Sequence, residues 1–301
     1  MLFWKPKAAN PSRLLMTILK GLAPAKINLT LHVTGQREDG YHLLDSLVVF
    51  TDAGDEIEVA SAPNIELTIS GPFTEGVPAD SSNIVLKAAN ALRYAHGVED
   101  GAIIRLTKNL PNGAGIGGGS SDAATILSML AQLWDVPELA PTSPAAVALG
   151  ADVPVCMHAP TPVRMSGIGE VISTVPTLPE CAMVLVNPMV HVPTGVIFDA
   201  LPSKNNEPMS SVPDGANVDE LANWLKHQRN DLLPPARQMA PEIDAALNAL
   251  ENNPLVLAAG MSGSGATCFG LVRDIGAARQ VARAIQISHM NWWVVPTQIL
   301  K

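Results

Sequence analysis

The pattern of apolar and polar positions predicts short strands in the first third of the chain and a mixture of helices and strands after it. Short apolar or alternating runs between turn residues are typical of strands, and they cover residues 27–33, 47–50, 56–60, 65–70, 102–108, 183–186, 267–272 and 292–299. Apolar residues at helical spacing predict helices over 82–95, 121–134, 218–232, 241–252 and 274–286. Because strands and helices do not alternate regularly, the order favours an α+β fold over a doubly wound sheet.

The segment between the strand predicted at 102–108 and the helix predicted at 121–134 is rich in glycine. It reads Pro111, Asn112, Gly113, Ala114, Gly115, Ile116, Gly117, Gly118, Gly119, Ser120 and Ser121. We expect Ser120 or Ser121 to cap the helix, with Asp122 in its first turn. Glycines let the backbone approach a ligand closely, and the free N–H groups at a helix N-terminus favour a phosphate. The segment predicts a phosphate-binding loop, against the alternative of a flexible turn that only begins a helix.

Two kinds of phosphate loop stay open from these residues alone. A Walker A loop is excluded because its lysine is missing. Gly113, Gly115 and Gly118 match G-x-G-x-x-G, the fingerprint of a dinucleotide-binding fold, although that unit usually begins its domain. The other candidate is the glycine-serine loop of a small-molecule kinase, and the polar clusters elsewhere in the chain favour it.

Composition and charge exclude several functional classes. The chain has 301 residues, 47% of them hydrophobic, and a net charge of −9, which is typical of a globular protein large enough for two domains. An acidic chain does not attract nucleic acid or an anionic membrane, so we expect neither as a partner. Three cysteines without a C-x-x-C pair argue for a reducing, cytoplasmic location. Residues 1–21 form a basic leader that lacks the apolar stretch of a secretory signal.

Two clusters of polar residues near the N-terminus each allow a structural and a functional interpretation. Lys26 and Asn28 have the spacing that places both on one face of a strand, where they are either solvated or pointed into a cleft. Tyr41 and His42 follow an Asp-Gly turn. They form either the packing of a hairpin or a flat, hydrogen-bonding surface suited to a nucleobase.

Two further clusters lie beyond the glycine-rich segment. Asp152 stands in Gly-Ala-Asp-Val-Pro, where it either caps a turn or accepts a proton from a hydroxyl nucleophile. Residues 261–265, Met-Ser-Gly-Ser-Gly, predict either a tight turn between strands or a second phosphate-sized nest of backbone amides. The nucleophile pattern G-x-S-x-G is absent around these serines, so we do not expect a hydrolase.

Taken in order along the chain, these clusters resemble the motifs of the GHMP small-molecule kinases. The motifs are P-A-K-I-N-L, D-G-Y-H, the glycine-serine segment, G-A-D-V-P and M-S-G-S-G, and the resemblance runs from about residue 22 to the C-terminus. The pair of K-I-N-L and D-G-Y-H resembles the branch that phosphorylates a cytidine diphosphate sugar-alcohol. A homoserine or mevalonate type of kinase, or a non-catalytic nucleotide-binding regulator on the same fold, is the alternative.

The resemblance implies a two-domain α+β fold with ATP and Mg²⁺ as cofactors. An ATP-binding domain resembling ribosomal protein S5 domain 2 would cover residues 22–163, and a ferredoxin-like domain would cover residues 164–301. Residues 111–121 would bind ATP, and Lys26 and Asp152 would form the catalytic pair. The substrate would be held by Asn28, Tyr41, His42, Thr194 and Phe198. Phe198 would stack on cytosine opposite Tyr41. The resemblance assigns no metal ligand, no oligomeric state and no role to the matching stretch Asn230-Asp231.

Overall fold

The computed structural model describes residues 18–301, which form two β-sheets with helices packed on them. Of the leader expected over residues 1–21, residues 1–17 lie outside the described part, and residues 19–21 begin the first strand. The prediction for the leader therefore concerns residues of which the structure says little.

The first sheet has one long central strand. Its members are β1 (Leu19–Asn28), β2 (His32–Gln36), β3 (His42–Ala62), β4 (Glu66–Ser70), β5 (Gly101–Thr107), β6 (Val163–Gly167) and β7 (Val171–Thr174). β1, β2, β5 and β6 all pair antiparallel with β3, and β4 runs parallel to β5. A sheet that is mostly antiparallel confirms the α+β class predicted from the order of elements.

The turn predicted between residues 50 and 56 is absent, because β3 passes through it unbroken. Asp52 and Ala53 bond to the last strand of the chain instead, since Asp52 Oδ1 accepts from Gln298 N at 2.8 Å. A Cβ on Gly54 would lie 2.4 Å from the carbonyl oxygen of Ala23 in β1. Gly54 is therefore needed because two strands approach closely at this position. In the sequence, a glycine used in this way cannot be told from a glycine in a turn.

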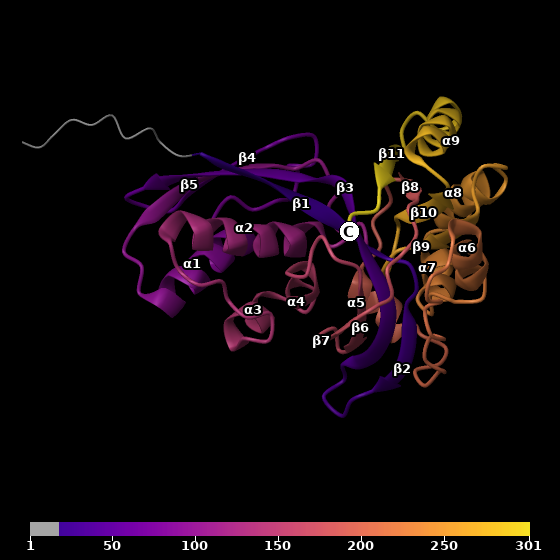
Figure 1. The fold of residues 1–301 in the computed structure, drawn as a ribbon, viewed down its shortest axis with the longest axis horizontal. Coiled ribbons are helices and arrows are strands. Elements are labelled where there is room, and N and C mark those ends of the chain that lie inside the picture. The colour runs from indigo at the N-terminus through magenta and orange to yellow at the C-terminus, as the bar shows by residue number, and fades with distance from the viewer. Residues whose placement is uncertain (1–17) are drawn as a thin grey trace, which may run out of the picture.

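In the part of the first domain that the structure describes, from residue 18 on, there are four helices. They are α1 (Ile84–His96), α2 (Gly118–Trp134), α3 (Pro144–Leu149) and α4 (Val153–Cys156). The predicted start of α1 is confirmed, because the Asn83 side chain accepts a hydrogen bond from Val85 N. Leu92, Ile126 and Leu130 pack against Ile104 of β5 in one buried cluster. This packing aims the N-terminus of α2 toward the centre of the molecule (Figure 1).

The second domain contains a four-stranded antiparallel sheet in the order β11-β8-β10-β9. Its strands are β8 (Ala182–Asn187), β9 (Ala258–Met261), β10 (Cys268–Val272) and β11 (Trp293–Gln298). Its helices are α5 (Thr194–Asp199), α6 (Val218–Lys226), α7 (Leu233–Met239), α8 (Glu242–Glu251) and α9 (Ile275–Ser288). The helix predicted over 218–232 therefore ends at Lys226, and the rest of that segment is a turn.

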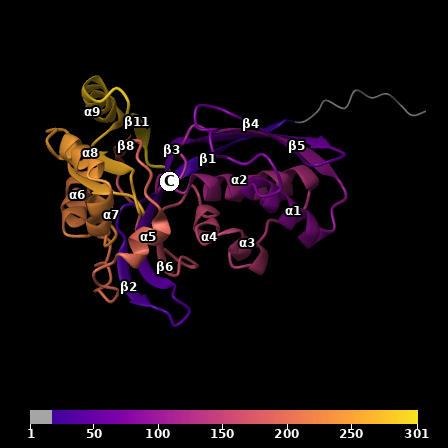
Figure 2. The same cartoon turned by 180° about the vertical axis from the view of Figure 1, so that it is seen from behind.

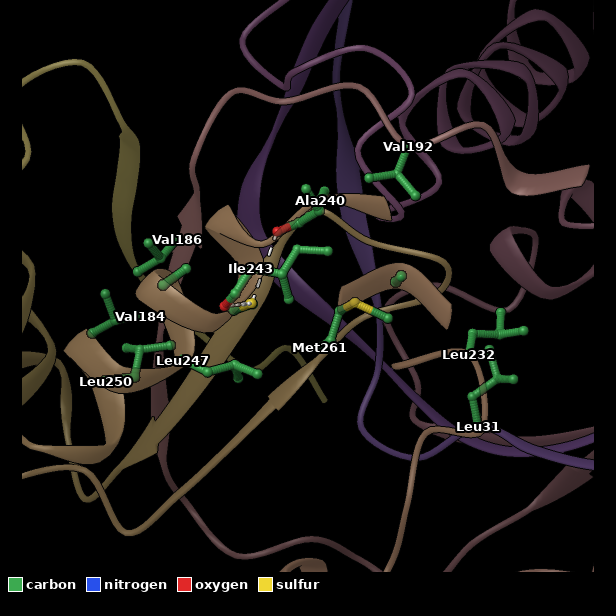
Figure 3. Packing of buried hydrophobic residues seen from close by; sticks show 14 of the residues in the cluster. Leu31, Val184, Val186, Val192, Leu232, Ala240, Ile243, Leu247, Leu250 and Met261 are labelled. Atoms are coloured by element: carbon green, nitrogen blue, oxygen red, sulfur yellow. Dashed lines mark hydrogen bonds between the residues drawn. The ribbon is translucent and has the colours of Figure 1, made fainter. Parts of the chain in front are cut away.

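Both faces of the second sheet are buried, and each face has a different partner. Val184 and Val186 pack on Ile243 and Leu247 of α8, as Figure 3 shows. Alternate residues of the same strand, such as Leu185, face a cluster that contains residues of β1 and β3 from the first domain. The period of two along β8 thus places one face of the second sheet on its own helices and the other face in a cluster shared with the first domain.

The first sheet runs past the boundary expected at residues 163 and 164. β6 and β7 pair with β3 and with each other, and the second sheet begins only at β8. The chain ends between the two domains, where Leu300 N donates to Phe50 O at 2.8 Å (Figures 1 and 2). The first sheet thus extends to Thr174, and the end of the chain returns to it.

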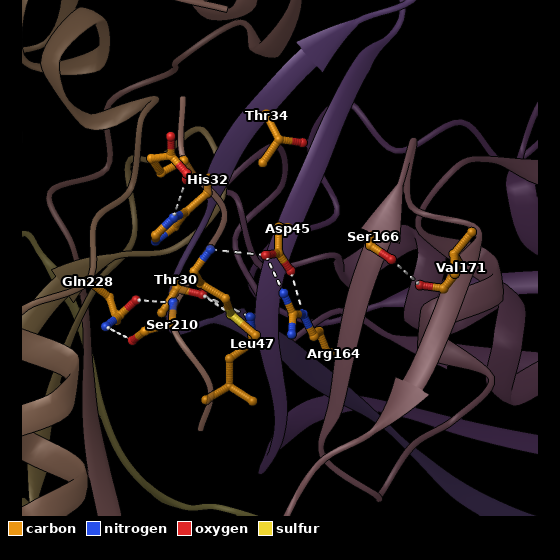
Figure 4. Close-up of polar contacts among 12 residues, drawn as sticks. Thr30, His32, Thr34, Asp45, Leu47, Arg164, Ser166, Val171, Ser210 and Gln228 are labelled. Atoms are coloured by element: carbon orange, nitrogen blue, oxygen red, sulfur yellow. Dashed lines mark hydrogen bonds and ion pairs between the residues drawn. The ribbon is translucent and has the colours of Figure 1, made fainter. Parts of the chain in front are cut away.

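Residues 205–217 contain no helix or strand, as their polar composition predicts. The segment is nevertheless attached to the first sheet, because Met209 N donates to Asp45 Oδ2 at 3.0 Å. Arg164 holds the same carboxylate with two bonds of 2.7 and 2.6 Å (Figure 4). Among residues 18–301, no helix is both long and apolar enough to cross a membrane.

Candidate active site

A cleft of about 760 Å³ lies between the two domains, and residues from every predicted cluster line it. Of the residues expected in the site, those lining it are Lys26, Asn28, Tyr41, His42, Gly113, Ala114, Gly115, Gly117, Gly118, Gly119, Ser120, Asp152, Thr194 and Phe198. Pro111, Ile116 and Ser121 are buried beneath the loop instead. Asn112 turns away from the cleft and donates to the carbonyl oxygens of Phe73 and Glu75. The phosphate loop, residues 111–121, thus presents mainly its glycines to the cleft.

Lys26 and Asp152 meet at the floor of this cleft. Lys26 Nζ lies 3.0 Å from Asp152 Oδ2 and 2.9 Å from Asn28 Oδ1. The Lys26 side chain is only 4% exposed, whereas that of Asp152 is 40% exposed. A buried ammonium is unfavourable without partners, so the carboxylate and the amide offset its loss of hydration. Asp152 stands at the N-cap position of α4 but makes no capping bond, which favours the chemical reading of this residue over the structural one.

The start of α2 differs from the prediction in one detail. Gly117, with φ of 65°, is the N-cap, and neither Ser120 nor Ser121 caps the helix. Asp122 is likewise not in the first turn. A Cβ on Gly117 would lie 3.1 Å from two carbon atoms of the Lys26 side chain, so glycine lets β1 pass directly under the helix. The first amides of α2, which follow this glycine, have no partner within the helix and are available to a phosphate.

The second glycine loop, residues 261–265, is both a tight turn and a wall of the cleft. Ser262 N donates to Thr267 O at 2.9 Å and Gly265 N donates to Ser262 O at 3.0 Å, which closes the turn between β9 and β10. Gly263 and Ser264 line the cleft. The loop packs backbone to backbone on the phosphate loop, since a Cβ on Gly115 would lie 2.5 Å from Ser262 O.

The opposite end of the cleft is aromatic. Tyr41 is 57% exposed at the hairpin between β2 and β3. His42 stacks on Phe198 of α5, with ring centroids 4.9 Å apart and an angle of 26° between the rings. Burial lowers the pKa of His42, which keeps its ring neutral at pH 7. Thr194 Oγ1 lies 2.8 Å from Ser264 Oγ. The ring stacked on Phe198 in this structure is thus that of His42 and not that of Tyr41.

A buried charged cluster under the phosphate loop was missed at the level of sequence. Lys108 Nζ bonds to Asp122 Oδ2 at 2.7 Å and also to Asp55. Asp55 Oδ1 in turn accepts from Asn109 N and Leu110 N, at 2.6 and 2.8 Å. Burial raises the pKa of Asp122 to about 7; the neighbouring Asp55 carboxylate adds to this rise and the Lys108 ammonium offsets part of it. These contacts tie the end of β5 to β3 and to α2.

A signal for this cluster exists in the alternation of the two strands. Lys108 lies two and four positions after Leu106 and Ile104, which are the inward-facing residues of β5, so it should point to the same side of the sheet. Asp55 has the same parity as Ile57, which is buried in β3. Extending the period of two by one step predicts that both charges face the interior.

A glycine-rich loop at a helix N-terminus, with an ammonium–carboxylate pair in a cleft between two α+β domains, defines a small-molecule phosphotransferase. Two family models match the chain: "GHMP kinases N terminal domain" over residues 83–159 and "GHMP kinases C terminal" over residues 210–290. The chain belongs to the GHMP kinase family, and it is an ATP-dependent small-molecule kinase. The resemblance inferred from the motifs is confirmed, and the dinucleotide-binding alternative is wrong.

Within this family, the chain aligns over nearly its whole length with relatives that share one name. The chain is 50% identical over 285 residues to 4-diphosphocytidyl-2-C-methyl-D-erythritol kinase of Ruegeria pomeroyi, covering 94% of this chain and 99% of the relative. It is 49% identical to the enzyme of the same name from Paramagnetospirillum magneticum, over 95% and 100% of the two chains.

Solved structures agree with these relatives. A crystal structure of 4-(cytidine 5'-diphospho)-2C-methyl-D-erythritol kinase superimposes with a TM-score of 0.71 at 30% identity, over 93% and 99% of the chains. Homoserine kinase from Cytophaga hutchinsonii gives a TM-score of 0.69 at 17% identity, over 100% and 98%, and shares the fold.

Proposed function

We propose that this protein transfers the γ-phosphoryl group of ATP to the 2-hydroxyl of 4-diphosphocytidyl-2-C-methyl-D-erythritol, in the non-mevalonate route to isoprenoid precursors. The names of the relatives at about 50% identity support the substrate. The observation that carries the chemistry is the 3.0 Å contact between Lys26 and Asp152 in the cleft, next to the N-terminus of α2. We also predict, from the net charge and the cysteine usage, that the protein works in the cytoplasm and has neither nucleic acid nor a membrane as a partner.

Asp152 acts as the general base in this proposal. Phosphoryl transfer depends on alignment and charge neutralisation more than on covalent help from the protein. The Asp152 carboxylate accepts the proton of the 2-hydroxyl as that oxygen bonds to phosphorus and the bond to the β-phosphate oxygen breaks. Lys26 holds Asp152 in place and offsets negative charge on the transferred group. The half-exposed carboxylate can reach a substrate, whereas the buried ammonium stays fixed below it.

The phosphate loop supplies the other contacts to the nucleotide. The amides at the start of α2 and the positive end of the helix hold the β- and γ-phosphates. Tyr41, His42 and Phe198 hold the cytosine at the aromatic end of the cleft. Asn28, beside Lys26, and Thr194, beside Ser264, also line the cleft and hold the substrate.

A magnesium ion fits this cleft when it is held mainly by ATP. Residues 18–301 contain no group of three or more His, Cys, Asp or Glu side chains that could form a metal site. Mg²⁺ usually keeps several waters and takes one or two carboxylates besides phosphate oxygens. The hydroxyl of Ser120 lines the cleft within the phosphate loop and suits that role, while Asp152 is kept for proton transfer. The bound ion would neutralise charge on the β- and γ-phosphates.

The test is a coupled assay of ADP release with three alcohols: 4-diphosphocytidyl-2-C-methyl-D-erythritol, homoserine and mevalonate. We expect turnover only with the cytidine compound. Turnover only with homoserine or mevalonate would overturn the substrate. Absence of turnover with all three, together with intact ATP binding, would favour the non-catalytic regulator.

A further inference from the structure

The turn between α6 and α7 pairs with the chain that carries the catalytic lysine. Leu31 N donates to Arg229 O at 3.0 Å, and Asp231 N donates back to Leu31 O at 2.8 Å. Leu31 directly follows β1, the strand that holds Lys26 and Asn28. These backbone bonds explain why the helix predicted over 218–232 ends early, because residues 229–231 pair with another segment instead of with their own helix.

Asn230 connects this turn to the second glycine loop. Its Nδ2 donates to Met261 O at 2.7 Å and to Gly263 O at 2.8 Å, while its Oδ1 accepts from Leu232 N at 2.9 Å. A side-chain amide offers two donors and an acceptor, and all three are used here. Met261, which accepts one of these bonds, belongs with Leu31 and Leu232 to one buried cluster (Figure 3). Asn230 itself does not line the cleft.

The second glycine loop transmits its position directly to the phosphate loop. Ser262 Oγ donates to Gly115 O at 2.9 Å and accepts from Asn28 N at 3.0 Å. A Cβ on Gly263 would lie 2.8 Å from Gly115 O, so the two backbones touch without an intervening side chain. Closely packed backbones pass on a displacement instead of absorbing it.

We propose that Asn230 is a positioning residue for ATP binding, acting through the second glycine loop. By holding the carbonyl oxygens of Met261 and Gly263, it sets the place of Gly115 and thus of the amides at the start of α2. It is distinct from the catalytic pair because it touches neither the cleft nor Lys26. The proposal rests on the proposed use of residues 111–121 for ATP.

The test compares Asn230→Asp with a matched control, Asn206→Ala. Aspartate keeps the shape of the side chain and the acceptor for Leu232 N, but it loses both donors and sets an oxygen against two carbonyl oxygens. Asn206 is a half-buried asparagine whose Nδ2 bonds to Val33 O and Asp231 Oδ2 in the same region, and it has no bond to the second glycine loop. The readouts are ADP binding by calorimetry, KM for ATP, KM for the cytidine substrate and thermal stability.

We expect Asn230→Asp to weaken ADP binding about tenfold or more, as the loss of two hydrogen bonds implies, and to raise KM for ATP by the same factor. KM for the cytidine substrate rises as well, because Ser262 and Ser264 of the same loop also contact Asn28 and Thr194, whereas Asn206→Ala leaves ADP affinity unchanged. Unchanged ADP affinity in Asn230→Asp overturns the proposal whatever its thermal stability, and so does an equal loss in both variants. If Asn230→Asp does not fold, Asn230→Ser, which keeps one donor, must show a smaller loss of the same kind. Wild-type protein that neither binds ADP nor releases it from ATP refutes the proposed function instead.

Discussion

Replacing Gly115 by alanine tests the central geometric claim, that the phosphate loop is shaped by close backbone packing. Gly115 has φ of 75°, in the left-handed region that strains residues with a side chain. The added Cβ would lie 2.5 Å from Ser262 O, 2.8 Å from Gly265 O and 2.9 Å from Gly265 N. All three atoms belong to the backbone, so no flexible side chain can move aside to make room.

The size of the effect follows from these contacts. The left-handed conformation costs about 1–2 kcal/mol for a residue with a Cβ, and overpacking a closely packed site costs about 1–3 kcal/mol. We therefore expect Gly115→Ala to lower the free energy of unfolding by about 2–5 kcal/mol. Relieving the contact also requires the two loops to separate by nearly 1 Å, and a misplacement of that size reduces turnover by about a hundredfold.

Urea denaturation and the coupled assay of ADP release measure the two effects. Gly119→Ala is the matched control for stability, because its Cβ would meet only Ile84 Cγ2, at an ordinary 3.7 Å, in a helical position. That control should keep or raise the free energy of unfolding, by up to about 1 kcal/mol. Equal stability of Gly115→Ala and Gly119→Ala would refute the argument from backbone packing.

Three further predictions concern the catalytic pair, the aromatic end and the buried charges. Asp152→Asn should lower kcat by about 10²- to 10⁴-fold with little change in ADP affinity, and near-normal kcat would exclude Asp152 as the base. Tyr41→Ala should raise KM for the cytidine substrate about tenfold or more but leave KM for ATP unchanged, and equal losses for both ligands would contradict stacking on cytosine. Because the pKa of Asp122 rises from 3.8 to about 7 on folding, its contribution to stability is complete below about pH 4 and is lost as the pH rises through 7. Thermal unfolding of Asp122→Asn should therefore vary less between pH 4 and 8 than that of the wild type, and identical profiles would contradict the raised pKa.

Sequence patterns were informative where one segment carries its own signal. The strand at 101–107 and the helix at 84–96 lie close to their predicted places, because alternation and an Asn cap are local properties. Local signals failed where a distant partner decides the conformation. Residues 50–56 are a continuous strand because β1 and β11 satisfy them, and residues 227–232 leave the helix because they pair with Leu31.

The same division holds in the active site. Most residues singled out by the motifs line the cleft, Lys26, Asp152 and Phe198 among them, whereas Asn112 and Ser121 do not; the roles of these residues stay predictions. The motifs did not predict the support beneath the cleft. Lys108, which is buried beneath the phosphate loop, belongs to none of the motifs.

The sequence alone determined the class of protein through the order of its five motifs, which resembles that of a kinase family, because each motif is a short run of neighbouring residues. The glycine-rich segment by itself left two kinds of phosphate loop open. Tertiary structure decided how these parts are held. Asn230, Ser262 and Asp55 hold backbone groups that lie far away in sequence, at distances that depend on how two sheets pack together. A one-dimensional pattern cannot contain those distances, because each is set by the packing of many side chains at once.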